Sequence, residues 1–252
     1  MNLVSSQRPQ ESFSKAACRY DHFSVLQKEI GLQLLKALPE KLYPYILDVG
    51  MGTGWLTEKI AKRFPQSKTA GLDYAFGMAA QAKKRKIDFV VQADAKRLPF
   101  QKQSFDLIIS NCAYQWVEDI PKAFSENARV LKKEGEFFFT CFGPSTLREL
   151  RESISQSARR HEGSGHSWHL LEKGKINQAL DQAGFRGVKV FSETRTERFD
   201  DIVSLIQWLK LIGANRVKRN IFIGPRLLAE ASDYYQRNFS LDDGVSATFE
   251  VI

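Results

Sequence analysis

Cysteine is scarce in this sequence, and long hydrophobic runs are absent from it. The 252 residues include three cysteines, Cys18, Cys112 and Cys141, whose number is odd and whose spacing matches no metal-binding motif. No run approaches the ~20 apolar residues that a membrane-spanning helix needs, and residues 1–11 are too polar for a secretory signal peptide. We therefore expect a reduced, cytoplasmic protein that does not contact a membrane.

Histidine is also scarce, and three of the four histidines fall in the glycine-rich stretch 161–169. No helix fixes the spacing of these side chains and no cysteine joins them, so we expect no metal site. The sequence has neither internal repeats nor low-complexity tracts, and its 43% of apolar residues suffices for a sizeable core. A formal net charge of +8 favours an acidic partner or nucleic acid, although a solvated basic surface explains it equally well.

Residues 46–55 carry the most informative pattern: an apolar run, an acid, and glycine at three alternate positions. We predict a buried strand, a tight turn in which glycine takes positive φ, and a helix that begins directly after it. A carboxylate this close to the turn would repel a pyrophosphate but suits a cation. The pattern therefore favours a ligand with a ribose and a positive centre but no phosphate, and S-adenosylmethionine is such a ligand. Its first candidate contacts are Asp48, Gly50, Gly52 and Gly54.

Two further predicted strands, 69–73 and 88–94, also end in an acid. Asp73 follows Gly50 by 73 − 50 = 23 positions, close to the interval of ~20 at which such folds place a ribose-binding carboxylate. Asp94 is placed to accept a hydrogen bond from the exocyclic amine of an adenine. The neighbouring residues Tyr74, Met78 and Ala95 complete this predicted nucleoside site.

A fourth predicted strand, 105–111, should end where a transferable methyl group meets its acceptor. Amide and aromatic side chains follow it, and aromatic faces attract a sulfonium cation. We expect Asn111 to contact the cofactor, and Tyr114, Gln115 and Trp116 to contact the substrate. With a fifth strand over 136–142, the alternation of strands and helices predicts an α/β fold with a doubly wound, mostly parallel sheet. Strand-like runs at 186–194 and 246–251 are expected to add an antiparallel edge, which gives seven strands.

The chain divides into three predicted parts. Residues 1–40 form a tail and lid helices, residues 41–144 form the cofactor-binding core, and residues 145–252 form a helical substrate cover together with the strands that complete the sheet. Because the first part precedes the sheet, we expect it to fold over the carboxyl edge of the strands. In the third part a helix over 146–160 carries Arg148, Arg151 and Arg159 on one side. Such a basic stripe suits an acidic protein, and a solvated face is the plainer alternative.

Several stretches resemble known families. Residues 46–55 resemble the first motif of the Rossmann-like methyltransferases that use S-adenosylmethionine. Other stretches resemble the malonyl-acyl-carrier-protein O-methyltransferases of biotin synthesis: residues 13–17 with Tyr20, 98–100, 111–116, 142–150 and 208–214. The last two stretches are the more particular, because they fall in the variable substrate cover. Met51 departs from the family, which usually has cysteine there, and the C-terminal segment is hard to align.

The resemblance implies an enzyme that methylates the free carboxylate of a malonyl group on an acidic acyl carrier protein, at the start of pimeloyl synthesis for biotin. A carboxylate with a pKa near 4 is ionised at pH 7, so this reaction needs no strong general base. A cationic or hydroxyl donor should orient it, and Arg129 and Tyr20 are the candidate catalytic residues. Arg148 and Lys210 are further candidates for substrate contact. We expect the protein to act as a monomer.

Three other functions stay open at this point. One is methylation of another acceptor, such as a quinone precursor or a small acid. Another is RNA modification or nucleic-acid binding, which the charge favours. The sequence lacks an appended RNA-binding domain, however, and after the fourth strand it has Asn111-Cys112-Ala113-Tyr114 in place of a base-methylating Asn-Pro-Pro-Tyr motif. The third is a protein that binds the cofactor without catalysis.

Overall fold

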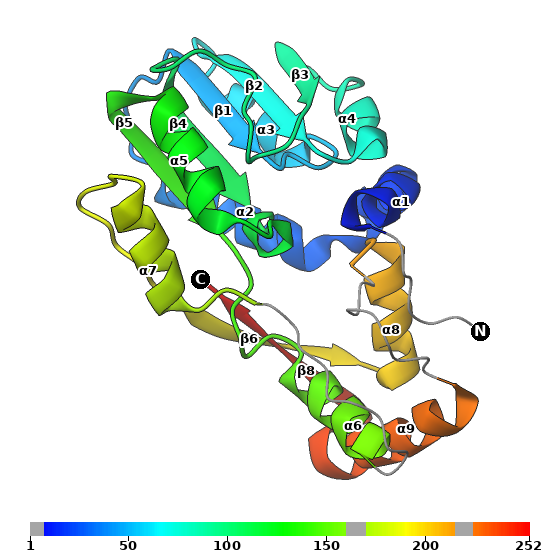
Figure 1. Cartoon of the computed structure of the whole chain (residues 1–252). Helices are drawn as coiled ribbons and strands as arrows, with labels where there is room; N and C mark the ends of the chain where they lie inside the picture. Colours follow the sequence, from blue (N-terminus) through cyan, green and yellow to red (C-terminus); the bar gives the residue numbers. More distant parts are fainter. Residues whose placement is uncertain (1–7, 160–169, 215–223) are drawn as a thin grey trace.

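The computed structural model describes residues 8–159, 170–214 and 224–252, and a five-stranded parallel sheet lies in the upper part of the view in Figure 1. Its strands lie in the order β3-β2-β1-β4-β5, and every neighbouring pair is parallel. The bounds are β1 Tyr45–Val49, β2 Lys68–Asp73, β3 Phe89–Gln92, β4 Phe105–Asn111 and β5 Leu131–Thr140. The strand order reverses between β1 and β4, and open α/β sheets bind ligands at such a reversal, outside the carboxyl ends of the strands.

Helices cover both faces of this sheet. Alternate residues of each strand point to opposite faces, so Ile46 of β1 packs with helices α2 (Val25–Ala37) and α3 (Trp55–Arg63), whereas Leu47 packs toward α5 (Ile120–Val130) and α7 (Lys173–Gln182). Both faces of the central strands are apolar because both are buried. This arrangement confirms the predicted α/β class and the doubly wound parallel sheet.

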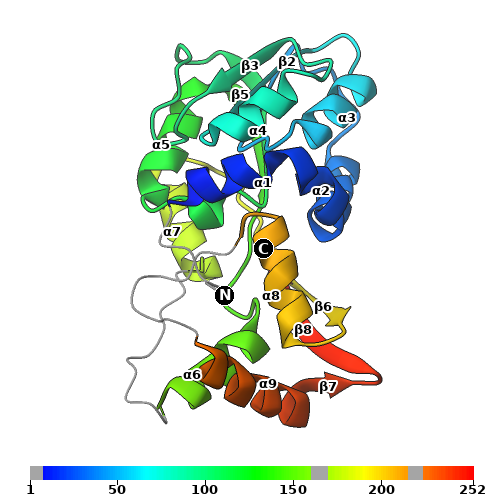
Figure 2. The same cartoon turned by 90° about the vertical axis from the view of Figure 1, so that its right-hand side faces the viewer.

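The N-terminal helix α1 (Pro9–Phe23) lies across the carboxyl edge of the sheet, between α4 (Phe76–Ala82) and α8 (Ile202–Leu211) (Figure 2). The Ser14 hydroxyl accepts a hydrogen bond of 3.1 Å from the backbone N–H of Gly77. At the other end of the helix, the Asp21 carboxylate accepts a bond of 2.5 Å from the Thr53 hydroxyl and pairs with Arg85. The helix is therefore held against α4 and against the loop after β1 by side-chain hydrogen bonds.

The remaining strands form a sheet of their own, which corrects the expected seven-stranded sheet. Strands β6 (Glu193–Phe199), β8 (Gly244–Val251) and β7 (Ser240–Leu241) pair antiparallel in the order β6-β8-β7. The C-terminal residue still touches the chain after β5: Cys141 and Ile252 exchange two backbone hydrogen bonds of 2.9 Å. Beyond that contact the inner face of β8 has its own apolar cover, from α6 (Arg148–Arg159), α8 and α9 (Pro225–Phe239). With this separate core, β8 diverges from the parallel sheet instead of extending it.

The described part of the chain can be searched for membrane-spanning helices and for groups of metal-binding side chains. No helix in it is long and apolar enough to cross a membrane. No group of three or more histidine, cysteine, aspartate or glutamate side chains in it could hold a metal ion. The histidine-containing stretch 161–169 lies outside the described residues.

Candidate functional site

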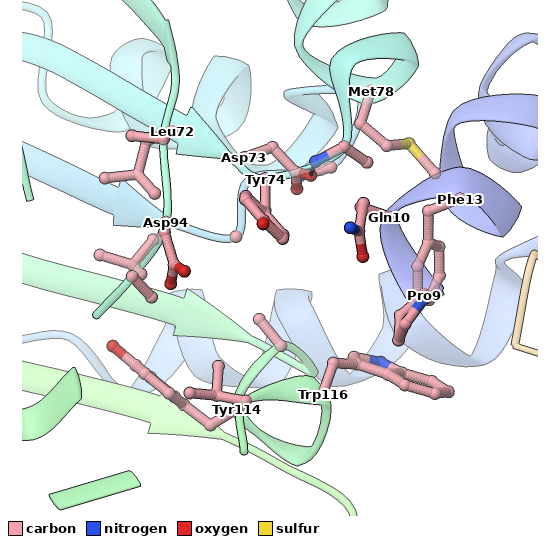
Figure 3. Close-up of a pocket in the computed structure, with 18 of the residues that line it drawn as sticks. Pro9, Gln10, Phe13, Leu72, Asp73, Tyr74, Met78, Asp94, Tyr114 and Trp116 are labelled. Atoms are coloured by element: carbon pink, nitrogen blue, oxygen red, sulfur yellow. Dashed lines mark hydrogen bonds between the residues drawn. The ribbon is translucent and has the colours of Figure 1, made fainter. Parts of the chain in front are cut away.

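A cavity of about 300 Å³ opens at the carboxyl ends of β1, β2 and β4, under the lid helix α1 (Figure 3). Asp73, Tyr74 and Asp94 approach it from the ends of the strands, and Gln10 and Phe13 face them from α1. The sequence-predicted cofactor residues that line this cavity are Gly50, Gly52, Asp73, Tyr74, Met78, Asp94, Ala95 and Asn111. Residues that the sequence placed at the ends of four strands are thus together in one site.

The three glycines of the turn have different surroundings. All three glycines have positive φ, at +74° for Gly50, +58° for Gly52 and +77° for Gly54. A Cβ on Gly50 would lie 2.4 Å from the Cβ of Ala113, and one on Gly54 would lie 2.6 Å from the Ile87 side chain. A Cβ on Gly52 would meet no atom within 4 Å, and Gly52 lines the cavity. Gly52 therefore presents bare backbone to a ligand, whereas Gly54, which does not line the cavity, serves the packing of α3.

Asp73 closes this turn from the neighbouring strand. One of its carboxylate oxygens accepts a hydrogen bond of 2.9 Å from the backbone N–H of Gly52, and the other accepts one of 2.8 Å from Ala75. Burial raises the pKa of Asp73 to about 6, although both backbone bonds oppose that rise. Each carboxylate oxygen has two lone pairs, so the side chain can hold the turn and still accept from two ribose hydroxyls.

Asp48 does not line the cavity, in contrast to the expectation of a direct ligand contact. It is 1% exposed, and one carboxylate oxygen accepts a bond of 2.6 Å from the Thr57 hydroxyl, while the other has no hydrogen-bond partner among the described residues. Burial raises the pKa of this carboxyl to about 7, and the nearby Asp73 adds to the rise. The next two residues, Val49 and Gly50, do line the cavity. Asp48 thus links β1 to α3 directly beside the turn, and its carboxyl is only partly ionised at pH 7.

A second and larger cavity of about 890 Å³ lies on the other side of one shared wall. Both cavities are lined by Phe13, Tyr20, Cys112, Trp116, Val117 and Glu118. The Phe13 ring of the lid helix α1 packs edge to face against the Trp116 ring, with ring centroids 5.1 Å apart. The rest of the second cavity is mostly apolar and comes from the C-terminal part of the chain, for example Leu147, Trp208 and Phe249. The two cavities suit two reactants that meet at the shared wall.

Two ionisable groups in the shared wall are held in their neutral forms. Burial raises the pKa of Tyr20 far above its usual value, and the negative charges of Asp73 and Asp21 add to that rise. Burial also raises the pKa of Cys112 to about 12, although its contact with Thr140 and the charge of Arg195 oppose the change. At pH 7 these two side chains are therefore a phenol and a thiol and neither is a base, while the wall also contains the Glu118 carboxyl.

Comparison with known proteins extends these observations. A methyltransferase-domain family model matches residues 47–139. The malonyl-acyl-carrier-protein O-methyltransferase of Geobacter sulfurreducens is 32% identical over 99% of this chain and 98% of its own length. The chain belongs to the malonyl-acyl-carrier-protein O-methyltransferase family.

Solved structures agree on the fold. A putative methyltransferase from Bacillus halodurans superposes with a TM-score of 0.62 at 19% identity, over 88% of this chain and 96% of that one. The phosphoethanolamine N-methyltransferase 2 of Haemonchus contortus, in complex with S-adenosyl-L-methionine, superposes with a TM-score of 0.52 at 22% identity, over 88% and 51% of the two chains. The sequence comparisons confirm the family resemblance and the methyltransferase class, and the solved structures confirm the fold.

Arg129 is the clearest correction among the residues predicted for this methyltransferase site. It lines neither cavity, and its guanidinium donates four hydrogen bonds of 2.7–2.9 Å, to the Glu126 carboxylate and to the carbonyls of Leu98 and Phe100. A helix that follows a parallel strand runs back toward the amino end of the sheet. Arg129 is the last residue but one of α5, and its carbonyl accepts from Gln103 just before β4 begins. It therefore braces the loop before β4, at the edge opposite the site.

Replacing Arg129 by alanine should destabilise the fold without weakening cofactor binding. The change leaves the Glu126 side chain, which is 12% exposed, without its cation and leaves two carbonyls without a donor. We expect a loss of about 2–3 kcal/mol in the free energy of unfolding, or roughly 5–10 °C in Tm. Calorimetric titration of the folded variant should give the wild-type Kd for the cofactor. A lower kcat with an unchanged Tm would contradict this structural role and indicate that Arg129 contacts the substrate.

The other predicted substrate residues separate into two groups. Tyr114 lines the first cavity, and its hydroxyl accepts a hydrogen bond from Asn127 of α5. Gln115 lines the second cavity, and Trp116 lines both cavities. Arg148 and Lys210 are exposed and line neither cavity. Of the expected arginine stripe, Arg151 turns inward to the carbonyl of Pro144, and the Arg159 side chain lies outside the described residues. Arg148 pairs with Glu149 at 3.1 Å.

Sequence reasoning missed several lining residues, among them the polar Gln10 and Gln27 and the charged Lys96, Glu118 and Lys175. Gln27 lies on α2 among Leu26, Ile30 and Leu34, a periodic apolar pattern that predicts core packing. The available signal was a glutamine at a position where that pattern calls for a buried residue. Such a polar residue on a buried face needs a partner.

Proposed function

We propose that this chain transfers the methyl group of S-adenosylmethionine to the free carboxylate of a malonyl group carried by an acyl carrier protein. The observation that carries the proposal is the pair of cavities that share one wall, in a chain related over its full length to enzymes named for that reaction. The first cavity takes the cofactor, and the second takes the acylated arm of the carrier.

The residues around the first cavity fit S-adenosylmethionine. Gly52 leaves open the space that a Cβ would fill, and Asp73 and Asp94 offer carboxylate acceptors to the ribose and the adenine. Leu72 and Met78 give apolar surface for the base. The cofactor supplies a methyl group bound to a positively charged sulfur, and the rest of the cofactor leaves as a neutral thioether. The task of the chain is to orient this group toward the second cavity and to exclude water.

The chemistry of the shared wall supports methylation of an oxygen. A carboxylate is ionised at neutral pH, so one of its oxygens can attack directly and no proton has to be removed. Methylation of carbon would require a base, and neither the protonated Tyr20 nor the protonated Cys112 is one. We propose that Tyr20, which lines both cavities, donates its hydroxyl hydrogen to the reactants. The benefit comes from position, because reactants held in line in a dry site lose little entropy on reaction.

The size of the second cavity and the charge of the chain support a carrier-bound substrate. Malonate alone is small compared with about 890 Å³, whereas a malonyl thioester on a pantetheine arm is long enough to extend from the surface to the shared wall. The formal charge of +8 favours encounter with an acidic carrier. Arg148 and Lys210, both exposed, are suited to contacting the carrier and not the acyl group.

The test is methyl transfer from labelled S-adenosylmethionine to malonyl-acyl carrier protein, beside malonyl-CoA and free malonate. We expect label on the carrier that mild base releases as methanol, which identifies a methyl ester, and a higher kcat/KM for the carrier than for either small substrate. Cofactor binding without transfer to any of the three substrates would contradict the proposed acceptor. Transfer to malonyl-CoA at an equal kcat/KM would contradict recognition of the carrier.

A further inference from the structure

Gln27 is a polar side chain enclosed in the wall of the second cavity. It lies near the start of α2, is 7% exposed, and lines the cavity. In the described part of the chain no hydrogen bond involves its carboxamide, and Oε1 is buried without a partner. A buried amide without a partner is costly. The Nε2 hydrogens are donors without a partner in the described part of the chain, so an anionic group in the filled cavity can accept from them, whereas Oε1 can only accept.

The backbone of Gln27 is tied to the point where the two cavities meet. Its carbonyl accepts a hydrogen bond of 2.9 Å from the side chain of Asn111, at the carboxyl end of β4. Asn111 lines the first cavity and also accepts a bond of 2.8 Å from the Thr140 hydroxyl. Just before α2, the carbonyl of Phe23 accepts from the indole N–H of Trp208 at 2.9 Å. The side chain of Gln27 is thus anchored between the cofactor side and the apolar wall of the second cavity.

We infer that the Gln27 carboxamide binds the carboxylate of the acceptor and fixes it for attack; this rests on the proposed function. The amide N–H donates to one carboxylate oxygen, which leaves the other oxygen free to form the new O–CH3 bond. As that bond forms, the methyl–sulfur bond breaks, its electron pair stays on sulfur, and no proton moves. The products are a neutral methyl ester and a neutral thioether.

A neutral donor suits this role better than a cation. A hydrogen bond from a charged group stabilises a carboxylate more strongly, and a tighter ion pair would lower its reactivity toward the methyl group. The buried and half-buried polar groups around Gln27 in this cavity include Tyr20, Gln115 and Thr146, all uncharged at pH 7. The lining also has two charged residues, Glu118 and the exposed Lys175, whose ammonium pairs with Glu172 at 3.5 Å. The Gln115 amide nitrogen is already used by the carbonyl of Cys112 at 2.7 Å, and the Thr146 hydroxyl by that of Glu250 at 3.2 Å. Among the buried residues of this lining, Gln27 has the carboxamide whose nitrogen has no partner in the described part of the chain.

The experiment compares Gln27→Leu and Gln27→Glu with wild type, using malonyl-acyl carrier protein and S-adenosylmethionine. The matched control is Gln33→Glu, which adds the same charge to the same helix on an exposed side that lines neither cavity. We expect both Gln27 variants to lower kcat/KM for the malonyl substrate by roughly 10–100-fold, the factor for one lost hydrogen bond to a charged group. The cofactor Kd should stay at its wild-type value in both variants, and the control should keep wild-type kinetics. The Tm of Gln27→Leu should not fall below that of wild type, whereas Gln27→Glu should have a lower Tm because its carboxylate is buried without a partner.

Two further readouts separate this contact from a structural role. Protonation of the glutamate in Gln27→Glu restores an isosteric donor, so its relative activity should rise as the pH falls from 8 to 6, whereas that of Gln27→Leu should not. Acetyl-acyl carrier protein lacks the carboxylate, so its inhibition constant should be unchanged in Gln27→Leu. An equal loss of affinity for acetyl and malonyl carriers would overturn the inference and assign Gln27 to the thioester arm.

The outcomes for this inference and for the proposed function are distinct. If wild type does not methylate the malonyl carrier, the proposed function fails. If wild type does, and Gln27→Leu retains its kcat/KM, the function stands and the role of Gln27 is wrong. Gln27→Asn, which keeps the amide but shortens the side chain, replaces Gln27→Leu should that variant fold poorly. It is expected to lose kcat/KM as well, because the donor no longer reaches.

Discussion

The substitution Gly52→Ala should abolish cofactor binding and leave the protein folded. A Cβ on Gly52 meets no protein atom within 4 Å and projects from a residue that lines the first cavity, so it would occupy space that the ligand needs. The fold loses only the strain of a non-glycine residue at φ +58°, about 1–2 kcal/mol. We expect the Kd for S-adenosylmethionine to rise by at least ~100-fold, equivalent to about 2.7 kcal/mol. Calorimetric titration, together with a Tm within a few degrees of wild type, is the measurement.

Gly50→Ala is the matched control, since it makes the same chemical change two residues earlier. Its Cβ would lie 2.4 Å from the Cβ of Ala113, so this variant must displace the segment after β4. It should lower the Tm clearly more than Gly52→Ala does. If Gly52→Ala binds the cofactor with wild-type affinity, the bare backbone of the turn does not contact the ligand, and the cofactor lies elsewhere in the cavity.

The cofactor site was predictable from sequence because its residues follow from the topology of parallel strands. Each acid or amide at the carboxyl end of a buried strand must come to the same edge of the sheet, and Asp73, Asp94 and Asn111 all line one cavity. The same reasoning would have excluded Arg129. It lies at the end of a helix that runs back from that edge, and the hydrogen bonds of its guanidinium agree with that position.

The substrate side was less predictable, because long-range packing determines it. Trp208 and Phe249 reach the second cavity only through α8 and β8, which pack against each other in a separate core. The separate sheet has the same cause: alternation predicts that β8 is a strand but not which sheet it joins. Gln27 was missed because helical periodicity shows which side of a helix is buried, and not whether the burial is against core or cavity.

Asp73→Asn should raise the Kd for the cofactor as much as Gly52→Ala does, although the side chain keeps its size. Asp73 accepts from the N–H groups of both Gly52 and Ala75, and an amide has only one acceptor oxygen. One backbone donor would then face an N–H group, the turn would loosen, and the ribose would lose an acceptor. We expect at least a ~100-fold higher Kd, from two weakened hydrogen bonds to a charged group.

The pH dependence of binding gives the sharper test of the same carboxylate. Burial raises the pKa of Asp73 to about 6. The ionised form accepts from every partner, whereas the protonated form must turn one O–H toward a donor. Affinity for the cofactor should therefore be full above pH 7 and fall as the pH drops through 6, approaching tenfold per pH unit below that value. Asp48, with a pKa raised to about 7, titrates nearby, so the comparison is with Asp73→Asn, which keeps Asp48 and lacks the Asp73 carboxyl. The fall between pH 6 and 5 should be smaller in Asp73→Asn. An equal fall in both proteins would show that Asp73 is not the group whose charge the cofactor requires.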